Sequence, residues 1–256
     1  MPRNTARAQV TPYRIASADG CKGGWVLALA GRWPCAEPPR LHLCADFRQV
    51  LALTRGCSAV AVDMPIGLPS SARPRACDDL AREELGSCRS RVFRTPPRQA
   101  LRARTVREFQ AIHRRICGVG AGYPVWNIVS KMREVDAAMT PSLQQRVFEF
   151  HPELVWKRLE GRPLPSKHTK AGLRTRLTIL RRFVPGMAGA LQWRKTFAGA
   201  VHLDDVLDAL VGLAAAHAVS AVCAASAISP TSGRARRLPS TRPPRDARGL
   251  RMEIWS

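Results

Sequence analysis

Six carboxylates lie at positions in the chain where they could bind metal ions or take part in catalysis. Three lie at or near the ends of apolar runs and three at the start of the apolar segment LDDVLDAL: Asp19, Asp63, Glu149, Asp204, Asp205 and Asp208. Carboxylates gathered in one place repel one another, and their pKa values rise unless a cation joins them. Mg²⁺ or Mn²⁺ suits all-oxygen ligands, and two ions about 4 Å apart can bind the attacking water and the leaving oxygen of a phosphodiester. If the fold brings these acids together, they predict metal-dependent phosphodiester hydrolysis.

Each acid also has a purely structural interpretation. Asp19 and Asp63 precede a Gly or a Pro turn, where an aspartate commonly caps the backbone. Asp204 and Asp205 suit the N-terminal dipole of a helix. Asp208 lies past the first helical turn between apolar neighbours, and it can share a helix face with Asp205, three residues earlier. Asp208 is therefore the hardest of the cluster to explain as a cap.

The apolar pattern predicts an α/β domain in which two strands end on these acids. Strands are predicted over 13–19, 25–31, 40–46 and 58–63, and a helix over 46–55 with Asp46 as its N-cap. Another strand is predicted to run through Glu149 in RVFEFHPEL (146–154), and helices are predicted at 127–139, 173–183 and 203–219. The glycines after Asp19 then form the tight turn between the first two strands.

Residues 73–140 are predicted to be a helical insertion in one domain that spans residues 13–256. The stretch 73–115 contains twelve arginines and five acids, and it has too few apolar residues to bury a core of its own. Residues 1–12 are predicted to be a flexible N-terminus. Residues 228–249 are predicted to be an irregular tail, followed by a small strand in LRMEIW.

The chain carries a large excess of positive charge. It has 41 lysines and arginines, only six of them lysines, against 19 acids, for a formal net charge of +22. The planar guanidinium group suits phosphate, so a polyanion is the natural partner of such a chain. A codon bias would raise the arginine content without explaining the scarcity of acids. We therefore expect DNA or RNA as the partner.

The expected contact surface is centred on RSRVFRTPPR (89–98). Its candidate residues, with two more speculative ones from elsewhere, are Arg89, Arg91, Arg94, Arg98, Lys167 and Arg176. Only Phe93 and Phe109 accompany these charges, so contact with the backbone of a structured nucleic acid is expected rather than base stacking. The alternative is a solvated basic helix pair that binds nothing.

The sequence predicts a soluble protein in the cytoplasm. The N-terminal segment is basic but has no apolar core, so it does not resemble a secretory signal. The longest apolar stretch, 206–229, contains Asp208 and His217 and predicts a buried helix rather than a membrane span. The eight cysteines include no CxxC pair, which argues against a zinc site.

Five motifs in order resemble those of one family, DUF429. They are ADGCKGGW, VDMPIGLP, CDDLAREELGSCRSRVFRTPPR, EFHPEL with SKHTKAGLRTR, and DDVLDAL. The resemblance runs from about residue 13 to the C-terminus. It implies an RNase H-like fold, with a five-stranded mixed sheet of order 3-2-1-4-5 flanked by helices, and nuclease activity.

The resemblance also implies the roles of the acids. Asp19 matches the acid of the first strand, Asp63 the acid at the end of the fourth strand, and Asp205 with Asp208 the pair on the last helix. That helix also looks like the last helix of Holliday-junction resolvases, which favours this pair over Asp204 and makes a homodimer possible. Glu149 has no equivalent in the resolvase pattern, so His151 or Glu153 could serve there instead, although His151 could merely cap the following helix.

Two other functions stay open from the sequence. The acids could be structural in a nucleic-acid-binding protein that has no catalytic activity. The chain could also be an actin-like phosphotransferase, in which the glycines after Asp19 would bind nucleotide phosphates. The chain is short for two such cores, and Asp63 is followed by Met-Pro rather than by a second Gly-rich turn, so this function is the weaker alternative.

Overall fold

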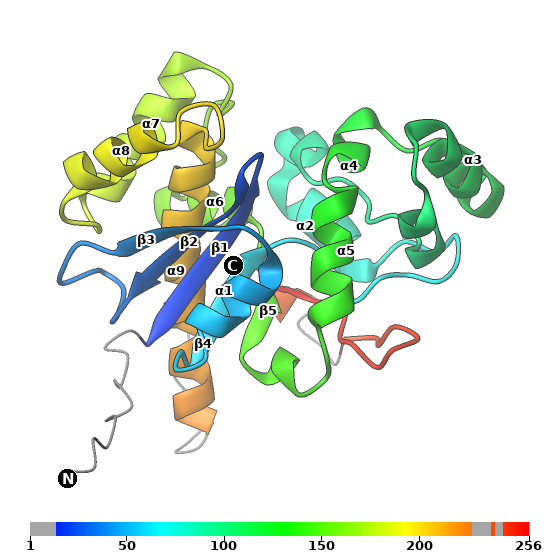
Figure 1. Cartoon of the computed structure of the whole chain (residues 1–256), viewed down its shortest axis with the longest axis horizontal. Coiled ribbons are helices and arrows are strands. Elements are labelled where there is room, and N and C mark those ends of the chain that lie inside the picture. Colours follow the sequence, from blue (N-terminus) through cyan, green and yellow to red (C-terminus); the bar gives the residue numbers. More distant parts are fainter. Residues whose placement is uncertain (1–13, 227–236, 239–242, 256) are drawn as a thin grey trace, which may run out of the picture.

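The computed structural model of the chain describes residues 14–226, 237–238 and 243–255. Its centre is a five-stranded sheet in the order β3-β2-β1-β4-β5 (Figure 1). The strands are β1 (Ile15–Cys21), β2 (Gly24–Ala30), β3 (Arg40–Cys44), β4 (Ala59–Asp63) and β5 (Val147–Glu149). β2 lies antiparallel to β1 and β3, whereas β4 lies parallel to β1 and β5. The predicted α/β class, mixed sheet and strand order are confirmed.

A two-residue turn joins β1 to β2. Cys21 and Gly24 are register partners, so Lys22 and Gly23 alone form the turn. Gly24 has φ +134°, and a Cβ there would overlap the carbonyl oxygen of Cys44. Glycine is required at that position because β3 approaches so closely.

The long helix α9 (Leu203–Ser226) covers one face of the sheet and packs on β1, β2 and β4. α6 (Pro152–Glu160), α7 (Lys170–Arg181) and α8 (Met187–Thr196) contact α9 on this side (Figure 1). Gly212 permits the close approach of α9, because a Cβ there would overlap the Ser17 hydroxyl and the Phe150 ring. Ile15, Ala59 and Ala61 belong to the core on this face.

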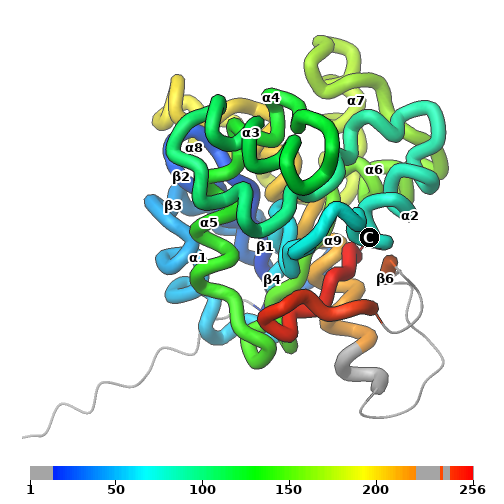
Figure 2. The backbone as a smooth tube through the Cα atoms, turned by 90° about the vertical axis from the view of Figure 1, so that its right-hand side faces the viewer, coloured from blue at the N-terminus to red at the C-terminus, as the bar shows by residue number. Residues whose placement is uncertain are grey.

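The second face of the sheet is covered by α1 (Phe47–Leu53) and by helices of residues 73–140. Ala16, Val60 and Val62 point into this second core. The helical elements of residues 73–140 are α2 (Ala76–Leu85), η1 (Gly86–Arg91), η2 (Arg98–Arg102), α3 (Val106–Cys117), α4 (Tyr123–Asn127) and α5 (Val129–Ala138). Figure 2 shows the molecule with this segment facing the viewer. As predicted, Asp46 caps α1, since its Oδ1 accepts a 2.8 Å hydrogen bond from the Gln49 amide.

Near the C-terminus, β6 (Arg237–Leu238) and β7 (Ile254–Trp255) form a small second sheet. β7 contacts β5 and α2, and it lies within the strand predicted for LRMEIW. A short η3 (Leu143–Gln145) precedes β5. The predicted flexible segment 1–12 and much of the predicted irregular tail lie outside the described residues.

Candidate active site

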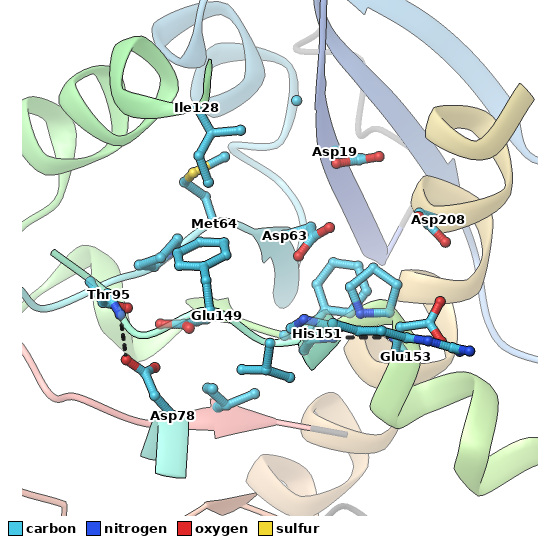
Figure 3. A pocket seen from close by; sticks show the side chains of 18 of the residues that line it. Asp19, Asp63, Met64, Asp78, Thr95, Ile128, Glu149, His151, Glu153 and Asp208 are labelled. Atoms are coloured by element: carbon cyan, nitrogen blue, oxygen red, sulfur yellow. Dashed lines mark hydrogen bonds and ion pairs between the residues drawn. The ribbon is translucent and has the colours of Figure 1, made fainter. Parts of the chain in front are cut away.

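A pocket of about 330 Å³ opens where β1 and β4 end and α9 begins (Figure 3). Carboxylates line one part of it: Asp19, Asp63, Asp205 and Asp208. Met64, Phe93 and Ile128 form an apolar part of the wall. The carboxyl ends of parallel strands are the usual location of ligand sites in open α/β sheets.

Asp19 and Asp63 lie side by side at the ends of neighbouring strands. They are register partners in the parallel pair β1 and β4. Side chains alternate along a strand, so Asp19 follows Ile15 and Asp63 follows Ala61 onto the face covered by α9. The strand pairing therefore brings together two carboxylates that are 44 positions apart in the chain.

These two carboxylates have no partner. Within the described residues, neither Asp19 nor Asp63 makes a hydrogen bond or an ion pair, although Asp19 is only 7% exposed. Burial raises the pKa of Asp19 well above its usual value, and the charge of Asp63 raises it further. The pKa of Asp63 is likewise raised by burial and then by the charge of Asp208. A cation beside them would relieve both effects.

Asp208, in contrast, is fully engaged. It is 1% exposed, and each of its oxygens accepts one hydrogen bond: Oδ1 from Trp156 Nε1 at 3.1 Å and Oδ2 from Lys167 Nζ at 2.8 Å. The same Lys167 ammonium lies 3.3 Å from Asp204 Oδ2. Burial lowers the pKa of Lys167, but Asp208 and Asp19 outweigh it, so the net shift is upward and the group is charged.

Asp205 lies at the start of α9 and also lines the pocket. Its Oδ2 accepts a 2.7 Å hydrogen bond from the His202 amide, which is the capping interaction expected of an acid at a helix N-terminus. Burial nevertheless raises the pKa of Asp205 to about 6. Asp205 therefore both caps the helix and presents a carboxylate to the pocket.

Glu149 lines the same pocket, but its side chain starts from the other face of the sheet. Its register partner in β4 is Val62, so its side chain lies on the second face of the sheet, opposite to Asp63. There Arg75 binds both carboxylate oxygens at 2.7 Å, and the Ile66 amide donates a 2.8 Å hydrogen bond. Burial raises the pKa of Glu149 to about 7 against the influence of Arg75. The catalytic role predicted for Glu149 would require its carboxylate to give up Arg75 or the Ile66 amide.

Arg176, one of the basic residues expected to contact nucleic acid, lies in the interior. Arg176 is fully buried, and its guanidinium donates to Glu153 Oε1 at 2.5 Å and to the Pro165 carbonyl at 2.8 Å. It also lies over the Trp156 ring. Its long side chain therefore makes its contacts inside the protein and does not form part of the surface.

The other candidates from the basic segment differ in accessibility. Arg89 and Arg94 are exposed, and Arg94 pairs with Asp79 at 3.0 Å while its side chain stays 62% exposed. Arg98 forms ion pairs with Asp136 and with Asp246. Arg91 lines the pocket, where its Nη1 lies 2.5 Å from Glu153. Arg89 and Arg94 thus remain free to meet a phosphate at little cost, and Arg91 lies at the pocket itself.

Sequence reasoning did not place Lys167 among the carboxylates, and it left the role of His151 open. Lys167 was expected on the binding surface and instead lies among the carboxylates; the one signal was its position in SKHTKAG before a predicted helix. His151 caps α6, because its Nδ1 accepts a 3.2 Å hydrogen bond from the Glu153 amide, yet it also lines the pocket. Burial lowers the pKa of His151, which favours the neutral imidazole.

The pocket carboxylates suit one divalent cation that has few protein ligands. In the described part of the chain, no three His, Cys, Asp or Glu side chains are close enough together to hold a metal. Mg²⁺, however, is commonly held by only one or two carboxylates, with waters and substrate phosphate as its other ligands. The buried Asp19 and the half-buried Asp63, both without partners in the described residues, match that requirement. The oxygen donors suit Mg²⁺ or Mn²⁺ rather than a soft metal.

One helix in the described residues has the length and hydropathy of a membrane span, namely Leu203–Val222. It is part of α9, which packs against the sheet and is largely buried there. The same length and composition are found in the central helices of proteins that cross no membrane. The helix is therefore weak evidence for a membrane span.

Comparison with known proteins gives one match. The family model described as "Protein of unknown function (DUF429)" matches residues 18–242. That range contains both partnerless aspartates, Lys167 and the first turns of α9. No curated protein and no solved structure matches the chain.

Proposed function

The chain belongs to the DUF429 family, and from its pocket we propose that it is a metal-dependent nuclease that hydrolyses phosphodiester bonds in structured DNA or RNA. The observation that carries the proposal is the Asp19–Asp63 pair. One buried and one half-buried carboxylate on neighbouring strands, without a hydrogen bond or ion pair in the described residues, are costly unless a ligand joins them. Mg²⁺ or Mn²⁺ is the proposed cofactor.

Asp19 and Asp63 would hold the ion, and Asp205 lies in the same pocket at the start of α9. A bound divalent ion supplies Lewis acidity and lowers the pKa of water in its coordination sphere. Hydrolysis then needs a water oxygen to bond to phosphorus, the bond from phosphorus to the sugar oxygen to break, and a proton to reach that leaving oxygen. Asp205, with a pKa of about 6, is suited to accept the proton of the attacking water near neutral pH.

The positive charges around the pocket favour a polyanionic substrate. Arg91 and Lys167 line the pocket. Arg89 and Arg94 are exposed and belong, like Arg91, to the basic segment 89–98. The excess of 41 basic over 19 acidic residues would attract a nucleic-acid backbone from a distance. The charge at the pocket and the charge of the whole chain thus favour the same class of substrate.

The test is cleavage of a panel of linear and branched DNA and RNA with Mg²⁺ or Mn²⁺, using the wild type and the variants Asp19→Asn and Asp63→Asn. We expect each variant to lose at least about 100-fold in rate, because removal of an electrostatic group at the reacting centre costs about that much. Glu37→Gln, an exposed acid outside the pocket, is the matched control and should cleave normally. Equal cleavage by the wild type and both Asp variants would refute the proposal.

A nucleic-acid-binding protein without catalysis is the second candidate, and the exposed Arg89 and Arg94 favour it. It predicts binding with a steep dependence on salt and no cleavage with any divalent ion. Mn²⁺ calorimetry separates the two functions, because only the nuclease requires binding of Mn²⁺ that depends on Asp19 and Asp63.

A further inference from the structure

We propose that the ammonium group of Lys167 fills one of the two cation positions of the carboxylate site, so that the protein binds one divalent ion rather than two. The inference rests on the proposed nuclease function and specifies its metal requirement. Two-metal sites hold their ions about 3.5–4 Å apart and need carboxylates that reach both ions. In this pocket Asp208 of α9 already has a cation of the protein's own.

The contacts of Asp208 are the first support. Its two oxygens each accept a hydrogen bond, from Trp156 Nε1 at 3.1 Å and from Lys167 Nζ at 2.8 Å. Asp208 is 1% exposed, and removal of one partner from a buried ion pair is strongly unfavourable. A second divalent ion on Asp208 would have to displace the ammonium group from this position.

The way the fold holds Lys167 is the second support. Lys167 lies in the loop between α6 and α7, two residues after Pro165, whose carbonyl accepts a 2.8 Å hydrogen bond from the buried Arg176. Thr169 caps α7 by accepting a 3.0 Å hydrogen bond from the Gly172 amide. Gly172 lets the loop pack tightly, since a Cβ there would overlap the Ser166 carbonyl. Buried contacts therefore fix the backbone on both sides of Lys167, and Arg176 is a positioning residue for it.

The third support is that Lys167 pairs with acids of the helix and not with those of the strands. Lys167 lies within 4 Å of Asp204 and Asp208, both on α9, and forms an ion pair with neither Asp19 nor Asp63 on the strands. The strand pair therefore remains available for one divalent ion, while the helix pair shares the single positive charge of Lys167. Such an arrangement supplies two positive centres to a phosphodiester with a single metal.

The test counts the Mn²⁺ ions bound per chain by calorimetry in wild type, Lys167→Met and Lys170→Met. We expect one ion in the wild type, two in Lys167→Met, and one in Lys170→Met, an exposed lysine three residues away that serves as the matched control. Electron paramagnetic resonance with excess Mn²⁺ gives an independent readout, with an isolated-ion spectrum for the wild type and an exchange-coupled pair for Lys167→Met.

Two ions in the wild type, or one ion in a folded Lys167→Met protein, would overturn the inference while leaving the nuclease proposal intact. If Lys167→Met does not fold by circular dichroism, the wild-type spectrum decides: an isolated ion supports the inference and a coupled pair overturns it. If the wild type binds no Mn²⁺ at all, the proposed nuclease function fails, and the inference fails with it.

Discussion

The substitution Asp63→Asn should make the protein more stable in the absence of divalent ions. The carboxylate of Asp63 is adjacent to Asp19 on the next strand and has no hydrogen bond or ion pair in the described residues. Its pKa is raised by burial and by the charge of Asp208, so its ionised form is disfavoured in the folded state. An amide of nearly the same shape removes the charge without leaving a cavity.

The size of the gain follows from the sheet geometry. Register partners on neighbouring strands lie about 5 Å apart, and two like charges at that distance repel by about 3 kcal/mol at an effective dielectric constant of 20. The charge of Lys167 lowers the pKa of Asp63 and so offsets part of this repulsion. We therefore expect a net gain of about 1.5 kcal/mol, which raises the Tm of a domain of this size by about 3–6 °C.

The pH dependence of this gain has a definite sign. Between the usual aspartate pKa of 3.8 and the raised pKa of Asp63 in the folded state, the folded protein keeps a proton that the unfolded chain has released, and above the raised pKa the ionised Asp63 repels Asp19. A folded state that binds more protons than the unfolded chain loses stability as the pH rises. The advantage of Asp63→Asn should therefore be small near pH 4 and grow toward pH 8.

The assay is thermal unfolding in EDTA at several pH values, with Asp78→Asn as the control. Asp78 undergoes the same change from acid to amide, but it is bound to Arg75 and accepts a 2.8 Å hydrogen bond from the Thr95 amide. Breaking that buried pair should cost about 3 kcal/mol. If Asp63→Asn lowers stability by 1 kcal/mol or more at pH 8, then Asp63 is a stabilising group and the reasoning that assigns it to a ligand is wrong.

Three further substitutions test the packing and the surface. Gly212→Ala should cost about 3 kcal/mol in urea unfolding, because its Cβ would overlap Ser17 and Phe150; unchanged stability would mean that α9 lies farther from β1. Arg176→Met should cost about 3 kcal/mol by breaking a buried ion pair, and wild-type stability would contradict its interior role. Arg94→Met should change stability by less than about 0.5 kcal/mol and lower the salt slope of nucleic-acid binding by about one; an unchanged slope would remove Arg94 from the contact surface.

The sheet could be predicted because its strands differ from their surroundings in the sequence. β1, β2 and β4 are short apolar runs that stop at Gly or Pro residues, and these signals are local. Their order and the parallel pairing of β1 with β4 came from the resemblance to DUF429. Once β1 and β4 are neighbours, the strand-end positions of Asp19 and Asp63 are enough to place these acids together.

The position of Glu149 could not be predicted in this way, because it depends on which face each residue of β5 occupies. β5 has only three residues, and Val147 and Phe148 are both apolar, so alternation does not reveal which side is which. The register with Val62 decides the question, and register is a property of the paired strands. A shift of one residue would have placed Glu149 on the same face as Asp63.

Ion pairing is the other property that the sequence does not show, and it makes the partnerless acids informative. The chain has 41 basic residues for 19 acids, so an acid that needs a cation has an ample supply. Three almost completely buried acids form an ion pair with an arginine or a lysine: Asp78, Glu149 and Asp208. Asp19 and Asp63 do not, because no arginine or lysine of the described residues is placed to form an ion pair with them. In a chain so rich in arginine, an unpaired carboxylate pair at a pocket is best explained by a cation that comes from outside the protein.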